Sequence, residues 1–305
     1  MQPKKRYYKF FYMLATILVL YFGFCFISAK QYLNPARKSS HTPPVGFKDT
    51  HISGPGYQLP AWTTVGLLTR APVSDTVFVL VHGYQGQRDG WRYVAQGLAK
   101  EGQEVIVPVL RAHETSPIGG CTFGKKEATD ILAAVRWARE RYNKPANVVL
   151  VGKSMGGSAV WYASAIDPSV DAVVSDAAFA RFDEAGRSWL KGMFWGANIL
   201  FRPVYWIADK FYHVKAEEIN PVEEAKNWRG RPALVIHGEK DPLLDLSHAT
   251  RLAEAAACPL WVVKGAKHED CSMVNLNLYV QKLLEIATKA KTRKAEALIY
   301  IDGQK

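Results

Sequence analysis

Short apolar runs alternate along the chain with longer amphipathic segments. Runs made mostly of Val, Ile and Leu are typical of strands that are covered on both faces of a sheet. Segments with helical spacing separate or follow these runs, as in Phe123–Tyr142 and Asn275–Ala290. This alternation predicts an α/β fold with a mostly parallel sheet and helices on both faces. The predicted strands are Asp75–Gly83, Glu104–Leu110, Asn147–Gly152, Val170–Asp176, Pro232–Gly238 and Pro259–Gly265.

The first part of the chain has a different pattern. Phe10–Ser28 is an apolar run without a formal charge, and it lacks the polar face of a helix packed in a globular core. As a helix it would span roughly 28 Å, close to the thickness of the hydrocarbon layer of a bilayer. We therefore predict a transmembrane signal anchor. A cleaved signal peptide is the alternative, although such peptides have a shorter apolar core and Ile27-Ser28-Ala29 is a poor cleavage site.

Basic residues are denser before this run than after it. Residues 4–9 hold four of them, whereas three are spread over residues 30–38. The positive-inside rule then places the N-terminus in the cytoplasm and the main domain outside it, which is the periplasm in a Gram-negative cell.

The pattern also predicts the domain organisation. The long interval between Asp176 and Pro232 has room for more than one crossover helix and is rich in aromatic side chains. We interpret it as a helical cap whose rings pack onto the body of the domain, with some lining an apolar channel or touching the bilayer. The predicted units are a basic cytoplasmic flank (1–9), the anchor (10–28), a linker (29–50), the folded domain (51–290) with its cap at about 182–220, and a basic tail (291–305).

Charge excludes one class of partner. The net charge of the 305 residues is +11, but residues 1–38 carry seven Lys/Arg and no acidic residue, and residues 282–305 carry six basic and three acidic residues. This leaves +1 for residues 39–281. Because the basic charge lies near the termini, anionic lipid head groups are the natural partner and no nucleic-acid surface is predicted.

The four cysteines do not form a disulfide framework. Cys25 lies in the apolar run, and the odd number in the remaining chain has no framework spacing. A Cys258–Cys271 bridge stays an alternative for an extracytoplasmic domain.

The strongest chemical motif lies where one predicted strand ends. Gly152-Lys153-Ser154-Met155-Gly156 fits G-x-S-x-G, with a strand before it and a helix after it. This context is that of a nucleophile elbow, in which a serine occupies a strained turn and its flanking glycines avoid collisions. Ser154 could instead be an ordinary helix N-cap, but an N-cap would not explain glycine on both sides.

A serine nucleophile needs a base, and the base needs an acid that orients it. Two later strands end with suitable residues at the same offset: Asp241 three residues beyond Gly238, and His268 three residues beyond Gly265. The resulting chain order is Ser, Asp, His. Asp176, at the end of an earlier strand, is the alternative acid. His82 and His237 each precede a glycine at a strand end, and we interpret them as structural.

An oxyanion site is the third requirement for acyl transfer, and fixed backbone donors often supply it. The residue after the nucleophile, Met155, is one expected donor. The loop after the first predicted parallel strand supplies the other, where Tyr84 is best placed. No metal and no organic cofactor is needed for this chemistry.

Several segments together resemble a known group of enzymes. They are VLVHGY, RAHETSPIGGCTFGKKEATD, VGKSMGG, VIHGEKDPL and GAKHED. From about Tyr57 to Leu284 the chain resembles the bacterial α/β-hydrolases of the BEM46/ABHD13-like group, in which a single N-terminal anchor also occurs. The resemblance implies a Ser–Asp–His serine hydrolase with Ser154, Asp241 and His268 as its triad and Tyr84 and Met155 as its oxyanion donors. Glu114 departs from the group, where a glycine is frequent near the pocket rim.

These observations predict a membrane-anchored serine hydrolase that cleaves carboxylic esters or thioesters through an acyl-enzyme. The aromatic cap and the anchor favour an apolar acyl or lipid-like substrate. A serine peptidase of the same fold is one alternative, and a non-catalytic, membrane-tethered binding protein is the other. The fold alone does not distinguish them, because it hosts many activities.

Overall fold

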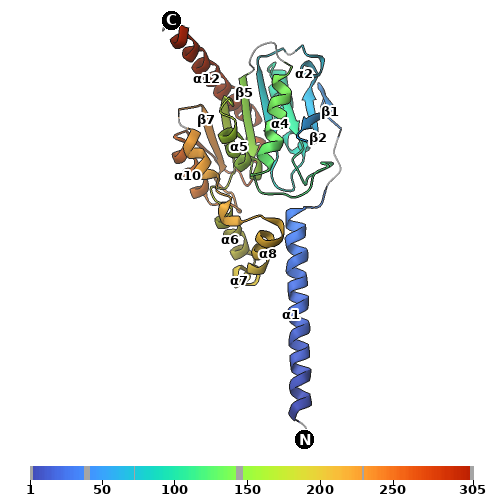
Figure 1. Ribbon diagram of the computed structural model, residues 1–305. Coiled ribbons are helices and arrows are strands. Elements are labelled where there is room, and N and C mark those ends of the chain that lie inside the picture. The colour runs from blue at the N-terminus through green and yellow to red at the C-terminus, as the bar shows by residue number, and fades with distance from the viewer. Residues whose placement is uncertain (1–2, 38–41, 72, 142–146, 229, 303–305) are drawn as a thin grey trace.

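The computed structural model describes residues 3–37, 42–71, 73–141, 147–228 and 230–302. These residues form one eight-stranded sheet with the order β1-β2-β4-β3-β5-β6-β7-β8 (Figure 1). β1, β2 and β4 pair antiparallel, and the strands from β4 across to β8 pair parallel. The strands are β1 (Phe47–Gly54), β2 (Tyr57–Thr64), β3 (Thr76–Val81), β4 (Glu104–Pro108), β5 (Asn147–Lys153), β6 (Ala172–Asp176), β7 (Ala233–Gly238) and β8 (Leu260–Val263).

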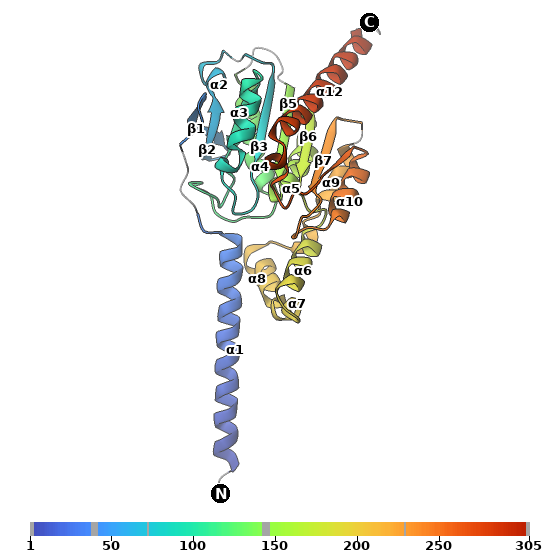
Figure 2. The ribbon, with the colours of Figure 1, turned by 180° about the vertical axis from the view of Figure 1, so that it is seen from behind.

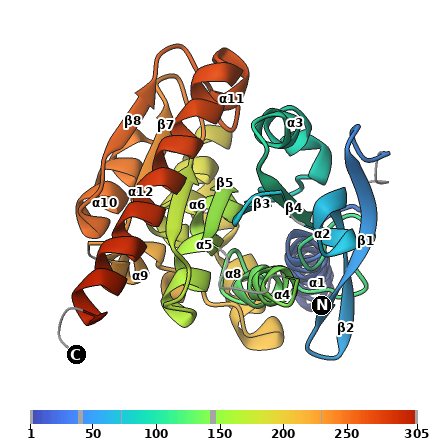
Figure 3. The same ribbon diagram turned by 90° about the horizontal axis from the view of Figure 1, so that it is seen from above.

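The six strands expected from apolar runs correspond to β3–β8, whereas the β1–β2 hairpin is not anticipated by the sequence pattern. β1 lies at the edge of the sheet, and most of its side chains are exposed or half-buried, so its sequence resembles that of a loop. Residues 47–50, expected in the linker, belong to β1, where Phe47 pairs with Thr64 across the hairpin. Seen from above, the sheet twists from β8 at one edge to β1 at the other (Figure 3).

Helices cover both faces of the parallel part of the sheet. α4 (Glu127–Arg139) and α5 (Met155–Ile166) lie in front of it in Figure 1, and α3 (Arg92–Lys100) and α12 (Leu276–Asp302) lie in front of it in Figure 2. Successive side chains of β3 enter opposite cores: Val77 and Val79 pack on the α4–α5 side, and Phe78 packs on the α3–α12 side. Burial on both faces explains why these strands are continuously apolar.

Shorter elements complete this part of the chain. They are α2 (Val65–Thr69), α9 (Pro221–Ala225), α10 (Leu246–Ala256), α11 (Cys271–Val274) and the 3₁₀ helices at Arg88–Trp91, Ala216–Glu218 and Lys226–Trp228. α12 continues to Asp302, so residues 291–302, expected in a basic tail, extend this helix. The four cysteines are free thiols.

Of the helices between β6 and β7, the first three lie below the carboxyl ends of the parallel strands (Figures 1 and 2). They are α6 (Phe182–Met193), α7 (Ala197–Leu200) and α8 (Arg202–Tyr212). We call them the cap. These helices lie within residues 182–220, and their role as a cap stays a prediction.

α1 (Pro3–Leu33) extends away from the sheet, and its last turns lie beside the cap (Figures 1 and 2). Within its segment Tyr7–Leu33, an 18-residue window has a mean hydropathy of 2.3 and 6% of that window is buried, so the helix is long and apolar enough to cross a membrane. The helix passes beyond Ser28, so residues 29–33, expected in the linker, are helical. Ala29 and Leu33 are both almost fully buried, and Pro35 follows soon after the helix end, where proline is common.

Candidate active site

Ser154 occupies the sharp turn between β5 and α5. Its φ and ψ are 52° and −118°, a backbone conformation that residues other than glycine rarely adopt. The Ser154 N–H donates to the Asp176 carbonyl at 2.8 Å, which fixes the turn against β6. Neighbouring glycines are required by contact: a Cβ on Gly152 would lie 2.2 Å from the Gly156 oxygen, and one on Gly156 would lie 2.4 Å from the Val81 oxygen.

The packing of the turn leads to a stability prediction. We expect Gly152→Ala to lower the free energy of unfolding by about 3 kcal/mol or more, because its Cβ would press on backbone atoms that cannot move without opening the turn. Gly192→Ala in α6 is the matched control, since nothing lies within 4 Å of its added Cβ, and we expect it to stay within about 1 kcal/mol of the wild type. Urea unfolding followed by circular dichroism measures both. Equal stability of the two variants would contradict the close packing of this turn.

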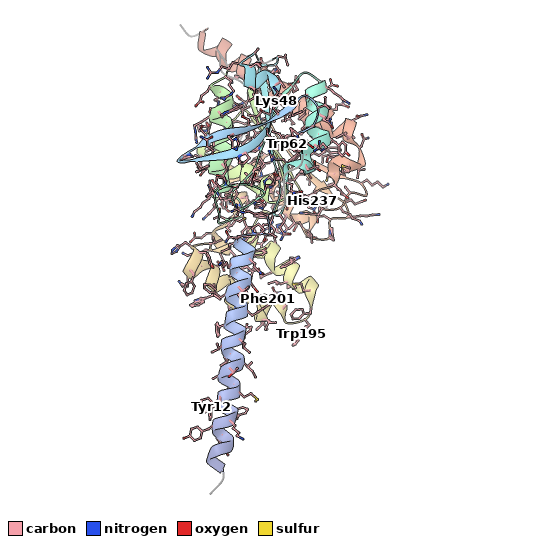
Figure 4. The ribbon with its side chains drawn as sticks, turned by 90° about the vertical axis from the view of Figure 1, so that its right-hand side faces the viewer. Tyr12, Lys48, Trp62, Trp195, Phe201 and His237 are labelled. Atoms are coloured by element: carbon pink, nitrogen blue, oxygen red, sulfur yellow. The ribbon has the colours of Figure 1, made fainter. Side chains whose placement is uncertain are left out.

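Three side chains predicted from the sequence lie together at the carboxyl ends of β5, β7 and β8. His268 Nε2 is 2.8 Å from Ser154 Oγ, and His268 Nδ1 is 2.7 Å from Asp241 Oδ2. Because an ionised carboxylate only accepts, Nδ1 carries the proton and Nε2 accepts from the Ser154 hydroxyl. His237, at the end of β7, marks this edge of the sheet in Figure 4.

The loop after β7 holds the carboxylate in place. Asp241 Oδ1 accepts hydrogen bonds from the backbone N–H of Leu243 at 2.8 Å and of Leu244 at 3.0 Å. The Asp241 side chain is 1% exposed, and His237 Nε2 is 3.1 Å from the Leu244 carbonyl oxygen. Both carboxylate oxygens are thus engaged, which restricts the imidazole to one orientation.

The alternative residues contact other partners. The second oxygen of Asp176, Oδ2, accepts from the Tyr279 hydroxyl at 3.0 Å, whereas His268 bonds to Asp241. His82 Nε2 accepts from the Leu110 N–H at 3.1 Å, and burial, with smaller contributions from His113 and Arg88, lowers the pKa of His82 to about 3. The rings of His82 and His237 both contact backbone groups, and their structural role stays an interpretation.

The electrostatics of the site favour an ionised acid beside a basic imidazole. Burial of Asp241 acts against ionisation, but the hydrogen bond and charge of His268 and the two backbone donors outweigh it and lower the pKa of Asp241. Burial alone would lower the pKa of His268, but the hydrogen bond and charge of Asp241 outweigh burial and raise this pKa above 6.5.

This shift leads to a pH prediction. If His268 is the base, only its neutral form accepts the Ser154 proton, so kcat/KM should rise with pH through the pKa of the free protein's histidine. We expect the midpoint of the acidic limb above 6.5 because the pKa of His268 is raised. Initial rates of ester hydrolysis between about pH 5 and 9 measure it. A midpoint below 6.5 would contradict the assignment of the acidic limb to His268.

The two residues predicted as oxyanion donors line the same pocket as Ser154. Met155 is the first residue of α5, and Tyr84 lies three residues after the end of β3. Both line a pocket of about 460 Å³ together with Ser154 and His268. The start of α5 adds the positive end of a helix dipole. Among the described residues, no group of three His, Cys, Asp or Glu side chains could hold a metal ion.

Glu114 does not shape the rim of this pocket in the way its position in the sequence suggests. Its side chain is buried and accepts from the Arg88 backbone N–H at 2.6 Å and from Arg88 Nε at 3.0 Å. Arg88 in turn bonds to Asp49 of β1 at 2.7 Å. Glu114 therefore connects its loop to the segment before α3 and to the hairpin.

Glu269 is a pocket residue that the sequence reasoning did not single out. It directly follows His268, has φ 62°, and lines the pocket with Ser154. A Cβ on Gly83 would be 1.9 Å from Glu269 Oε1, so any other residue there would force the Glu269 carboxyl group to move. Burial raises the pKa of Glu269 despite the nearby charges of His268 and Lys153. No spacing rule connects Gly83 with Glu269, and the contact became visible only in the structure.

Comparisons with known proteins agree on the fold. Residues 76–205 match a family described as alpha/beta hydrolase fold. Among solved structures, the esterase Pf2001 of Pyrococcus furiosus is 22% identical with a TM-score of 0.69, over 85% of this chain and 98% of that chain. Est1E from Butyrivibrio proteoclasticus is 18% identical with a TM-score of 0.59, over 80% and 99%.

An acylaminoacyl peptidase of Pyrococcus horikoshii is 15% identical with a TM-score of 0.58, over 79% of this chain and 40% of that one. A search of curated protein sequences found no match. Likenesses at these identities establish the fold, and the chain has the α/β-hydrolase fold that the sequence predicts.

Proposed function

We propose that this protein is a serine hydrolase that cleaves carboxylic esters or thioesters through an acyl-enzyme. The observation that carries the proposal is the continuous hydrogen-bond chain from Ser154 through His268 to Asp241. The strained turn at Ser154 adds support, because it exposes the hydroxyl at the carboxyl edge of a parallel sheet, where such folds bind their ligands. The esterase neighbours are consistent with this class of reaction.

Each residue has a defined role in the proposed mechanism. His268 takes the Ser154 proton as Oγ attacks the acyl carbonyl carbon, and Asp241 stabilises the imidazolium that forms. The backbone N–H groups of Met155 and Tyr84 bind the oxyanion. His268 then gives its proton to the leaving alkoxide or thiolate, and a water molecule activated by the same imidazole releases the acid. The sequence resemblance to the BEM46/ABHD13-like group stays a prediction.

We further propose that α1 anchors the domain in a membrane, with the N-terminus in the cytoplasm. The length and hydropathy of Tyr7–Leu33 and the basic residues before it support this topology. The packing of α1 on the cap favours an uncleaved anchor over a signal peptide, since cleavage after Ala29 would remove Cys25 and Ala29 and expose Ile207, which packs against them. No contact of the described residues favours the peptidase or the binding protein.

Pre-steady-state kinetics of the detergent-solubilised full chain test the proposed reaction. An acyl-enzyme mechanism predicts a burst of p-nitrophenol from p-nitrophenyl acetate, with an amplitude close to one per protein molecule when deacylation is slower than acylation. The covalent intermediate can be trapped by acid and located by mass spectrometry. The absence of both turnover and a trapped acyl group in a folded protein would contradict the proposal.

A further inference from the structure

We propose that the end of α1 forms a wall of the acyl-binding pocket, and that the substrate is a membrane lipid ester whose acyl chain enters this pocket from the bilayer. This inference rests on the proposed serine hydrolase function. A second pocket, of about 160 Å³ and almost entirely apolar, lies between α1, α6 and α8. Its lining includes Ala29, Tyr32 and Leu33 of α1 and Val204 and Ala208 of α8.

The apolar pocket adjoins the pocket that contains Ser154. The two pockets share four aromatic lining residues: Tyr32, Phe123, Phe182 and Trp189. The Phe123 and Phe182 rings are stacked at 4.1 Å, and Tyr32 lies 5.0 Å from Phe123. A substrate with its carbonyl carbon at Ser154 can therefore direct its chain past these rings toward α1. A surface of this composition binds hydrocarbon and offers few partners to a polar or charged group.

α1 is fixed to the domain at this point. A helix leaves its last carbonyl groups unpaired, and here the domain supplies the missing donors. The Tyr84 hydroxyl donates to the Tyr32 carbonyl at 2.8 Å, and the Cys121 N–H donates to the Leu33 carbonyl at 2.7 Å. Because Tyr84 is also the predicted oxyanion residue, the end of the anchor contacts the catalytic loop directly.

The cap also contacts α1 nearer to the N-terminus, at a level that the predicted span places inside the membrane. The Tyr21 hydroxyl donates to the Leu200 carbonyl at 2.5 Å, and the Phe24 and Phe201 rings are 6.3 Å apart. Tyr21 precedes Ser28, the predicted end of the span, by about 10 Å along the helix. The cap tip therefore reaches into the upper part of the acyl-chain layer, below the head groups.

Exposed side chains of the cap suit this depth. Trp195 is 97% exposed and Trp206 is 53% exposed, and tryptophan is favoured at the membrane interface. In Figure 4, Phe201 lies beside α1 and Trp195 at the end of the cap away from the sheet. Exposed basic residues such as Arg202 and Lys210 can extend their long side chains toward the lipid phosphates above this level. The apolar pocket thus lies where an acyl chain can enter from the leaflet.

Two substitutions fill the pocket from opposite walls. Ala29→Phe adds a ring from α1 and Ala208→Phe adds one from α8, at positions 1% and 9% exposed. Ala15→Phe, on an exposed part of α1, is the matched control. The full chain is reconstituted in phosphatidylcholine vesicles, and kcat/KM is measured for p-nitrophenyl acetate and p-nitrophenyl palmitate. We expect each pocket variant to lower the palmitate value at least about tenfold while acetate stays within about twofold, and the control to change neither.

Each outcome has a distinct meaning. If the wild type hydrolyses neither ester, the proposed function itself fails. If it hydrolyses acetate but the pocket variants keep the wild-type ratio of palmitate to acetate, the hydrolase stands and the acyl pocket is wrong. Retained acetate hydrolysis in either variant shows that its site is folded, so one intact pocket variant is sufficient to decide.

Discussion

Replacement of His268 by alanine is expected to lower kcat for ester hydrolysis by about 10⁴-fold or more. His268 Nε2 lies 2.8 Å from Ser154 Oγ, within hydrogen-bond reach, and can accept its proton. Without it the serine hydroxyl stays protonated and is a poor nucleophile. The residual rate would come from substrate binding and the oxyanion site. Steady-state hydrolysis of p-nitrophenyl acetate measures the loss.

The control for this variant is His51→Ala, because His51 is exposed in β1 and far in sequence from the site. It should keep the wild-type rate. A His268→Ala protein that is folded and retains more than about a tenth of the wild-type kcat would show that another group is the base, because loss of a general base costs at least about 10²-fold.

Asp241→Asn is expected to lower kcat by about 10⁴-fold while the fold is kept. The amide has nearly the same shape as the carboxylate, but its NH₂ group can donate to His268 Nδ1. That contact favours the tautomer with the proton on Nε2, which cannot accept from Ser154. The variant also loses the negative charge that raises the pKa of His268, so the acidic limb of the pH profile should move to lower pH.

Asp245→Asn is the matched control for the same chemical change. Asp245 lies four residues later, is exposed, and caps α10 by accepting from the Ser247 N–H at 2.9 Å. Asparagine caps helices about as well as aspartate, so activity should be unchanged. Equal activity of Asp241→Asn and the wild type would remove Asp241 from the mechanism and return attention to Asp176.

The sequence predicts the parallel part of the fold well because its strands are buried on both faces. Burial of this kind produces continuous apolar runs such as that of β3, whose residues are all buried. The same strands end in the loops that hold the polar residues of the site. The offsets of Asp241 and His268 from their glycines were therefore enough to predict that both residues lie next to Ser154. The residues of the predicted triad are therefore close in space, and their catalytic role stays a prediction.

Other features could not be predicted because they depend on contacts between distant segments. The β1 edge strand has a largely polar surface, and only its pairing with β2 identifies it. The approach of Glu269 to Gly83 and the contact of the Tyr84 hydroxyl with the end of α1 follow no spacing rule. Hydropathy shows that α1 is apolar enough to cross a membrane but does not reveal that its last turns line a pocket.

The central claim is that Ser154 is an activated nucleophile, and covalent labelling by a fluorescent fluorophosphonate tests it most directly. Wild type, Ser154→Ala and Ser158→Ala are labelled in parallel, and the modified peptide is identified by mass spectrometry. Ser158 is the matched control because it lies one turn along α5 and its hydroxyl donates to the Phe179 carbonyl at 3.2 Å. The predicted result is labelling at residue 154 in the wild type and in Ser158→Ala, and none in Ser154→Ala. A folded wild type that is not labelled, or labelling that survives Ser154→Ala, would contradict the claim.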